Sequence, residues 1–128
     1  MIEGFVYFIW PVTEKHESIK IGFSIQPDYR LWTLNYCTPF QIEVAASAPG
    51  TRKTEQNVQD CFAHCHRWNE WFHPHPDLLG AIEKLRAGVP LEEAVDLSKR
   101  TGRLFIGNRK NRKHFPNQMV PIDQTVAA

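Results

Sequence analysis

Four polar side chains in the first half of the chain have the chemical types that hydrolyse phosphodiesters. The phenol of Tyr7 can act as a general base if neighbouring cations lower its pKa. The cations Lys20 and Arg30 can hold phosphate oxygens. The carboxylate of Glu55 can hold Mg²⁺, with waters and a substrate phosphate in the remaining positions. If the fold brings them together, these groups could perform metal-assisted hydrolysis of a phosphodiester.

Each of these residues also has an ordinary structural interpretation. On a helical projection Arg30 lies beside Leu34, and Glu55 lies at the edge of an apolar stripe. A charge in such a position is costly unless it is paired or binds a metal. An Arg30–Glu55 ion pair, a buried tyrosine with a satisfied hydroxyl and a surface lysine remain the alternative.

Three short segments predict the strands that would position this set. Residues 5–11 are aromatic and β-branched without polar alternation, which indicates a strand buried on both faces. Residues 19–22 alternate and predict the second strand of a hairpin, and residues 40–47 alternate again. In such a hairpin Tyr7 and Lys20 can face the same side of the sheet.

Helical patterns follow these strands. Pro27 suits a first helical turn, and Gly88 and Gly102 suit helix ends. The predicted helices cover residues 27–36, 51–68, 76–88 and 90–102, with a short extended piece at 70–74. The order of elements predicts an α+β fold with a small antiparallel sheet flanked by helices.

Taken in order, these segments resemble the GIY-YIG nuclease superfamily. The first motif corresponds to residues 5–7 and the second to Lys20–Gly22, followed by Arg30 and Glu55. The most similar branch consists of small single-domain members with a KIG second motif and an EWF element, here residues 70–72. The resemblance covers about residues 4–86.

The resemblance implies a nuclease domain at residues 1–90 with a three-stranded antiparallel sheet, acting on DNA with Mg²⁺ or Mn²⁺. In that picture Tyr7 activates the attacking water and Arg30 stabilises the charge of the phosphorane. Lys20 replaces the tyrosine of the second motif and contacts phosphate or a water, and Glu55 is the metal ligand.

Three further positions are compared with the family pattern. Gln59 stands where the branch often has a histidine four residues after the glutamate. Tyr36 is the nearest match to an aromatic or histidine after the arginine, and Asn69 to a late asparagine. Because of these departures, a DNA-binding relative without cleavage activity remains an alternative.

Cysteine and histidine are concentrated between residues 61 and 75. The cluster consists of Cys61, His64, Cys65, His66, His73 and His75. It allows a third hypothesis, a small zinc-stabilised interaction domain. However, both cysteines lie on or beside an apolar stripe, so we expect them in the core rather than on zinc.

The charge is unevenly distributed along the chain. Residues 1–98 carry eight Lys/Arg and thirteen Asp/Glu, a balance of −5, whereas residues 99–128 carry seven and one, a balance of +6. We expect residues 91–128 to form a helix and a flexible basic tail that contacts DNA phosphates; a solvated tail without a partner is the alternative. The basic residues are Lys99, Arg100, Arg103, Arg109, Lys110, Arg112 and Lys113.

Length and composition restrict the class of protein. A chain of 128 residues is enough for one domain with a core. Three cysteines, an odd number, favour a reducing compartment, and no membrane-length apolar run or secretory signal is seen. We therefore expect a cytoplasmic protein without a membrane partner. A domain this small could need a homodimer or a partner protein for specificity.

Overall fold

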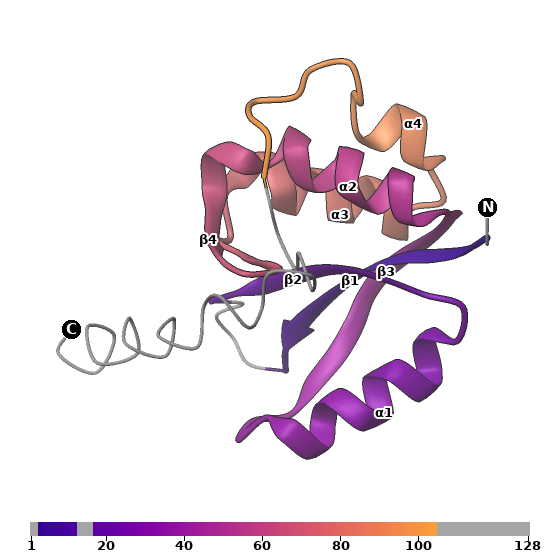
Figure 1. Cartoon of the computed structure of the whole chain (residues 1–128), viewed down its shortest axis with the longest axis vertical. Coiled ribbons are helices and arrows are strands. Elements are labelled where there is room, and N and C mark those ends of the chain that lie inside the picture. The colour runs from indigo at the N-terminus through magenta and orange to yellow at the C-terminus, as the bar shows by residue number, and fades with distance from the viewer. Residues whose placement is uncertain (1–2, 13–16, 105–128) are drawn as a thin grey trace, which may run out of the picture.

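The computed structural model describes residues 3–12 and 17–104 (Figure 1). The strands are β1 (Gly4–Pro11), β2 (Ile19–Ser24), β3 (Ile42–Gly50), β4 (His66–Trp68) and β5 (Trp71–Phe72). The helices are α1 (Pro27–Cys37), α2 (Arg52–Cys61), the 3₁₀ turn η1 (Ala63–Cys65), α3 (Pro76–Arg86) and α4 (Leu91–Ala94).

The strands form one antiparallel sheet with the order β3-β1-β2-β5-β4. This confirms the α+β class with helices flanking an antiparallel sheet. The expected number of three strands is wrong, because β5 pairs with β2 and β4 extends the sheet further. The two added strands have only two and three residues, too few to show an alternating pattern in the sequence.

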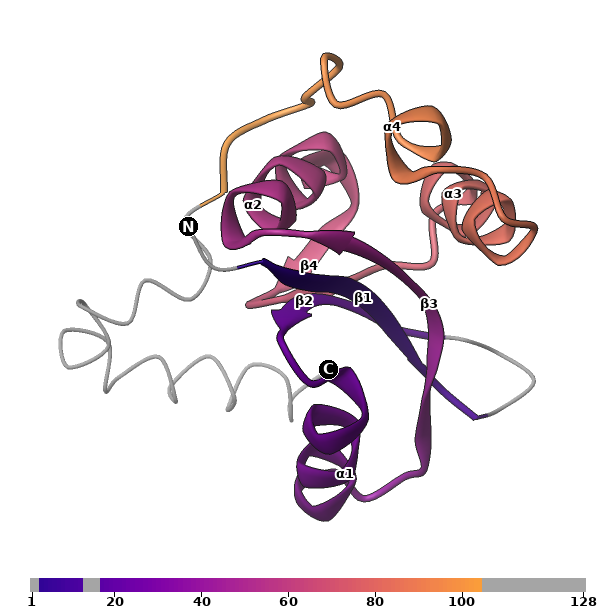
Figure 2. The same ribbon diagram turned by 90° about the vertical axis from the view of Figure 1, so that its right-hand side faces the viewer.

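Helices cover both faces of the sheet. Figure 2 shows α1 on one face and α2 with α3 on the other. Consequently β1 is buried on both sides, as its continuous apolar sequence predicted. Tyr7 and Ile9 pack toward Leu31 and Leu34 of α1.

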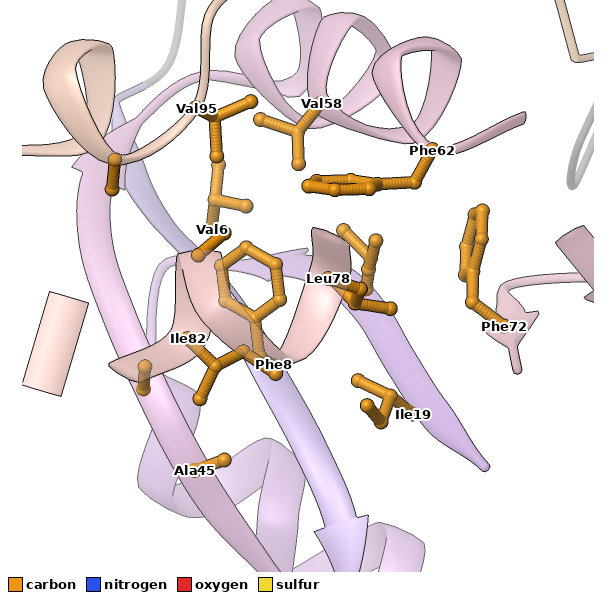
Figure 3. Packing of buried hydrophobic residues seen from close by; sticks show 14 of the residues in the cluster. Val6, Phe8, Ile19, Ala45, Val58, Phe62, Phe72, Leu78, Ile82 and Val95 are labelled. Atoms are coloured by element: carbon orange, nitrogen blue, oxygen red, sulfur yellow. The ribbon is translucent and has the colours of Figure 1, made fainter. Parts of the chain in front are cut away.

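The main core lies on the opposite face of the sheet. Val6 and Phe8 of β1 pack there with side chains from α2 and α3 (Figure 3). Val58, Phe62 and Cys65 are all buried, which confirms the stripe expected in this segment.

The register between β1 and β2 places Tyr7 opposite Gly22 and Ile9 opposite Lys20. Directly opposed residues point to the same face, and so do residues two apart on one strand. Tyr7 and Lys20 therefore share a face, as the hairpin prediction required.

Two predicted helices are shorter than expected, whereas those at 27–36 and 76–88 are confirmed with small shifts at their ends. The helix expected over 51–68 ends at Cys61, and the chain continues through η1 into β4. The carbonyl of Cys65, the last residue of η1, accepts a hydrogen bond from the His73 N–H at 2.8 Å. The helix expected over 90–102 ends at Ala94. The Asp96 carboxylate accepts hydrogen bonds from the Ser98 N–H and hydroxyl, which favours a turn over a helix.

Within the described residues, no helix combines the length and the apolar character that crossing a bilayer would require.

Candidate active site

A pocket of about 490 Å³ opens where residues from both sides of the sheet meet. Phe23 and Ile25 supply its apolar wall. Its polar lining consists of Tyr7, Ser24, Arg30, Arg52, Glu55 and Glu70. Three of the four residues singled out from the sequence, Tyr7, Arg30 and Glu55, therefore line one cavity.

The beginnings of two helices deliver charged residues to this pocket. Pro27 occupies the start of α1, which places Arg30 in the first turn. The Thr51 hydroxyl caps α2 by accepting a hydrogen bond from the Thr54 N–H, and the Thr54 hydroxyl accepts a second hydrogen bond from the Thr51 N–H. This cap begins α2 so that Arg52 and Glu55 lie at the end nearest the pocket.

Tyr7 reaches the pocket because Gly22 leaves room for its ring. A Cβ atom at Gly22 would lie 2.5 Å from both Cζ and Oη of Tyr7. The ring is 2 % exposed, and this burial raises the pKa of the Tyr7 phenol. A hydrogen bond with Arg30 acts in the opposite direction but does not outweigh burial. The expected lowering of the Tyr7 pKa by neighbouring cations is thus reversed.

Arg30 is exposed on α1, next to Leu31 of the half-buried face that packs on Tyr7 and Ile9. It faces the pocket, and its hydrogen bond joins it to Tyr7 rather than to Glu55. An exposed guanidinium beside a cavity remains accessible to an anion, which a buried ion pair would not allow.

Glu55 is a buried carboxyl with no strong cationic partner. It is 8 % exposed, and burial together with the neighbouring Glu70 carboxyl raises the pKa of Glu55 to about 7. Arg52 and Lys20 lower this pKa only in part. A buried carboxyl without an ion-pair partner of its own, as a metal ligand would be before the metal binds, is present at this position.

Glu70 belongs to the site although the sequence reasoning did not assign it a role. Its carboxylate forms an ion pair with Lys20, and its side chain is within hydrogen-bonding reach of Glu55. The Glu70 backbone carbonyl accepts a hydrogen bond from the Ile21 N–H at 3.0 Å, which fixes it next to β2. The available signal was its position in the EWF element, one residue before β5.

Lys20 is 6 % exposed and does not line the pocket. Its ammonium group lies 6.0 Å from the centre of the Trp71 ring, beside its ion pair with Glu70. Lys20 is therefore linked to the pocket through its ion pair with Glu70, which does line it.

The three additional candidates lie outside the pocket lining. The Gln59 side chain is buried and donates to the Ile21 carbonyl at 2.9 Å, which ties α2 to β2. Tyr36 is 75 % exposed and packs edge-on against Trp32 on the outside of α1. Asn69 has a φ of 53° in the turn between β4 and β5, and its carbonyl accepts a hydrogen bond from His66.

The basic residues at the C-terminal end are described only in part. Lys99, Arg100 and Arg103 are exposed. The other four, Arg109, Lys110, Arg112 and Lys113, lie outside the described residues.

The donor set of the pocket fits a hard divalent cation. Glu55 and Glu70 offer carboxylate oxygens side by side, and oxygen ligands are those preferred by Mg²⁺ and Mn²⁺. The neighbouring Glu70 carboxylate raises the pKa of Glu55, and a bound cation would offset this repulsion. The neighbouring Arg30 and Arg52 can hold the phosphate that such an ion would also bind.

Comparison with known proteins gives one family. No curated protein and no solved structure shows a significant match to the chain. The T5orf172 domain matches residues 4–96, a span that contains every residue lining the pocket and ends just after α4. Since this match covers most of the sequence, the chain belongs to the T5orf172 domain family.

Proposed function

We propose that this domain is a divalent-metal-dependent DNA endonuclease of the GIY-YIG type, which nicks or cleaves phosphodiester bonds in the cytoplasm. The observation that carries the proposal is the convergence of Tyr7, Arg30 and Glu55 on one pocket from three different elements. The T5orf172 domain occurs in nuclease-like proteins of phages and bacteria, which supports a nuclease or DNA-binding role.

The residues divide the work of hydrolysis between them. Arg30 and Arg52 bind the scissile phosphate, and Arg30 stabilises the charge that grows on its oxygens. Tyr7 acts as the base in its phenolate form, which the neighbouring Arg30 favours; it accepts a proton from the water that attacks phosphorus and becomes a neutral phenol. The bond from phosphorus to the leaving oxygen breaks, and that oxygen takes a proton from solvent.

The carboxyls form the metal-binding part of the site. Glu55 is the direct ligand, and Glu70 supplies a second carboxylate, which Lys20 holds in place through the ion pair. When bound, Mg²⁺ or Mn²⁺ would neutralise charge on the phosphate and the leaving oxygen.

Nicking of supercoiled plasmid tests the proposal. We expect the wild type to convert the plasmid to open-circular DNA with Mg²⁺ or Mn²⁺ and not with EDTA. Glu55→Gln and Arg30→Ala should each reduce the rate by at least about 100-fold. The matched controls Glu93→Gln and Arg67→Ala change an exposed glutamate and an exposed arginine outside the pocket, so their rates should equal that of the wild type.

Absence of nicking by a folded wild type that still binds DNA would refute the endonuclease proposal. It would favour the second candidate, a nucleic-acid-binding module on the same fold. That candidate draws support from the raised pKa of Tyr7, since a phenol that resists ionisation is a poor base.

A further inference from the structure

A second cluster of possible metal ligands lies away from the pocket. His64 of η1, His75 just before α3 and Asp77 in the first turn of α3 each offer one ligand atom, and these atoms lie within 4.8 Å of one another. Nε2 of His64 is 3.0 Å from Oδ2 of Asp77, and Nδ1 of His75 is 3.6 Å from the same oxygen. None of the three residues lines the candidate active site.

The hydrogen bonds of His64 determine which of its ring nitrogens faces Asp77 without a proton. The Thr101 hydroxyl contacts the carbonyls of Asp60 and Cys61 at 3.3 and 3.1 Å, and a carbonyl can only accept. Because the Thr101 hydroxyl donates its only proton to these carbonyls, Thr101 Oγ1 must accept its other hydrogen bonds. It accepts them from the backbone N–H of His64 at 3.1 Å and from Nδ1–H of the His64 ring at 3.0 Å. A neutral His64 ring then presents the lone pair of Nε2 to the carboxylate of Asp77.

His75 presents a second lone pair to the same place. Its Nδ1 accepts a hydrogen bond from the Asp77 N–H at 3.0 Å as the cap of α3, so this nitrogen carries no proton. The Nε2 lone pair of His64 therefore faces the Asp77 carboxylate, and His75 Nδ1, which holds the Asp77 N–H, lies beside the same carboxylate. A cation between the three groups would offset the repulsion between Nε2 and the carboxylate.

The spacing of the three groups suits a tetrahedral transition-metal ion. Zinc bonds to nitrogen and oxygen ligands are about 2.0–2.1 Å long, so neighbouring ligands in a tetrahedron are about 3.3 Å apart. The two separations from Asp77 Oδ2, 3.0 and 3.6 Å, fall on either side of this value, and the two histidine ligand atoms lie within 4.8 Å of each other, so they would move closer on binding. The Asp77 side chain is 62 % exposed, which leaves room for a water as the fourth ligand.

We propose that His64, His75 and Asp77 bind one Zn²⁺ ion, or a similar ion such as Co²⁺ or Ni²⁺, at a site distinct from the candidate active site. Thr101 is a positioning residue, because its hydrogen bond orients the His64 ring with Nε2 toward the metal. Coordination by His75 Nδ1 exchanges its cap hydrogen bond for a bond to the metal. The ion connects η1 to α3 and, through Thr101, to the segment that packs on the end of α2.

The site contains no cysteine, unlike the zinc site considered from the sequence. Cys61 and Cys65 are 6 % and 4 % exposed within the hydrophobic core. Burial raises the pKa of the Cys65 thiol to about 11, which disfavours the thiolate that zinc would need.

Titration of the metal-free full-length protein with Co²⁺ and Zn²⁺, in excess Mg²⁺ to occupy the carboxylate pocket, tests this inference. We expect one equivalent of Co²⁺ to give the visible absorption of a tetrahedral site, and Zn²⁺ to displace it. His64→Ala and Asp77→Asn should remove the signal, whereas the exposed His73→Ala should keep it. Thr101→Val, which retains all three ligands, should weaken binding about 10-fold.

Several results would overturn the proposal. These are no saturable binding by the wild type, equal binding by the wild type and Asp77→Asn, or a sulfur-to-cobalt charge-transfer band that assigns the metal to a cysteine. Circular dichroism in EDTA checks that each variant is folded, and Asp77→Asn preserves the side-chain shape if His64→Ala does not fold. The readout is metal binding, so it does not depend on whether the protein cleaves DNA.

Discussion

Replacing Gly22 by alanine should displace Tyr7 from the candidate active site. An added Cβ would lie 2.5 Å from Cζ and Oη of Tyr7 and 2.8 Å from Cε1. Carbon atoms in ordinary contact are about 3.5–4.0 Å apart, so the ring would have to move by about 1 Å. Tyr7 is 2 % exposed and packs on Ile9 and Ile42, which leaves little free space for this movement.

The cost of Gly22→Ala follows from this overpacking. Adding a methyl group to a well-packed site destabilises by about 1–3 kcal/mol, and 1 kcal/mol lowers the Tm of a domain of this size by about 4 °C. We therefore expect the Tm to fall by about 4–12 °C. A 1 Å misplacement of a reacting group costs about 100-fold in rate, so plasmid nicking should fall to a similar extent.

Gly80→Ala is the matched control for this experiment. Gly80 lies inside α3, and a Cβ there would meet nothing within 4 Å. The same chemical change should stabilise the protein by up to about 1 kcal/mol, since alanine favours the helix. Thermal unfolding followed by circular dichroism measures both variants. Our account of the contact between Tyr7 and Gly22 is wrong if Gly22→Ala is as stable as the wild type.

Three further predictions follow from the burial of charged groups and thiols and from the basic C-terminal end. Because the Glu55 pKa is raised from 4.5 to about 7 by burial and by Glu70, and only partly lowered by Arg52 and Lys20, the unfolded state loses this proton first. The free energy of unfolding of the metal-free protein should therefore decrease by up to about 3 kcal/mol as the pH rises from about 4.5 to 7. Chemical denaturation should show this loss in the wild type and not in Glu55→Gln. Cys65, buried and with a pKa raised to about 11, should resist alkylation at pH 8 in the native protein and react fully in guanidinium, as peptide mapping would show; rapid native labelling would contradict its burial. Removing residues 105–128, which include four Lys/Arg between 109 and 113, should reduce the slope of log affinity for duplex DNA against log salt by up to about 3–4; an unchanged slope would mean that this segment does not contact phosphate.

Local sequence signals predicted the elements that are long or have clear ends. The apolar run of β1 and the proline starts of α1 and α3 are examples, because burial on two faces and a missing N–H leave marks in the sequence. The early end of α4 was missed because its cause, the turn at Asp96, competes with a helical pattern that continues past it. The extended piece predicted at 70–74 contains β5, but its place in the sheet depends on pairing with β2, and β4 depends in turn on pairing with β5. Such pairing is not a local property of the sequence.

The sequence also predicted part of the candidate site. The motifs identified Tyr7, Arg30 and Glu55, since their spacing is part of an ordered pattern, and the structure brings these three to one pocket. The role of Glu70 was not predicted, because only the fold places it between Lys20 and Glu55. The direction of the Tyr7 pKa was also wrong, since burial of the ring depends on packing by α1.

The order in which the chain supplies its pocket has a consequence for synthesis in the cell. Tyr7 and Arg30 leave the ribosome early, but Glu55 and Glu70 come later, and the core that holds α2 in place also needs Leu78 and Ile82 of α3. An incomplete chain therefore lacks both the carboxyls and the packing that would align them. A domain built in this way has no assembled site before most of it has been translated and folded, so under the proposed nuclease function a nascent or truncated copy would not cut the DNA of the cell that makes it.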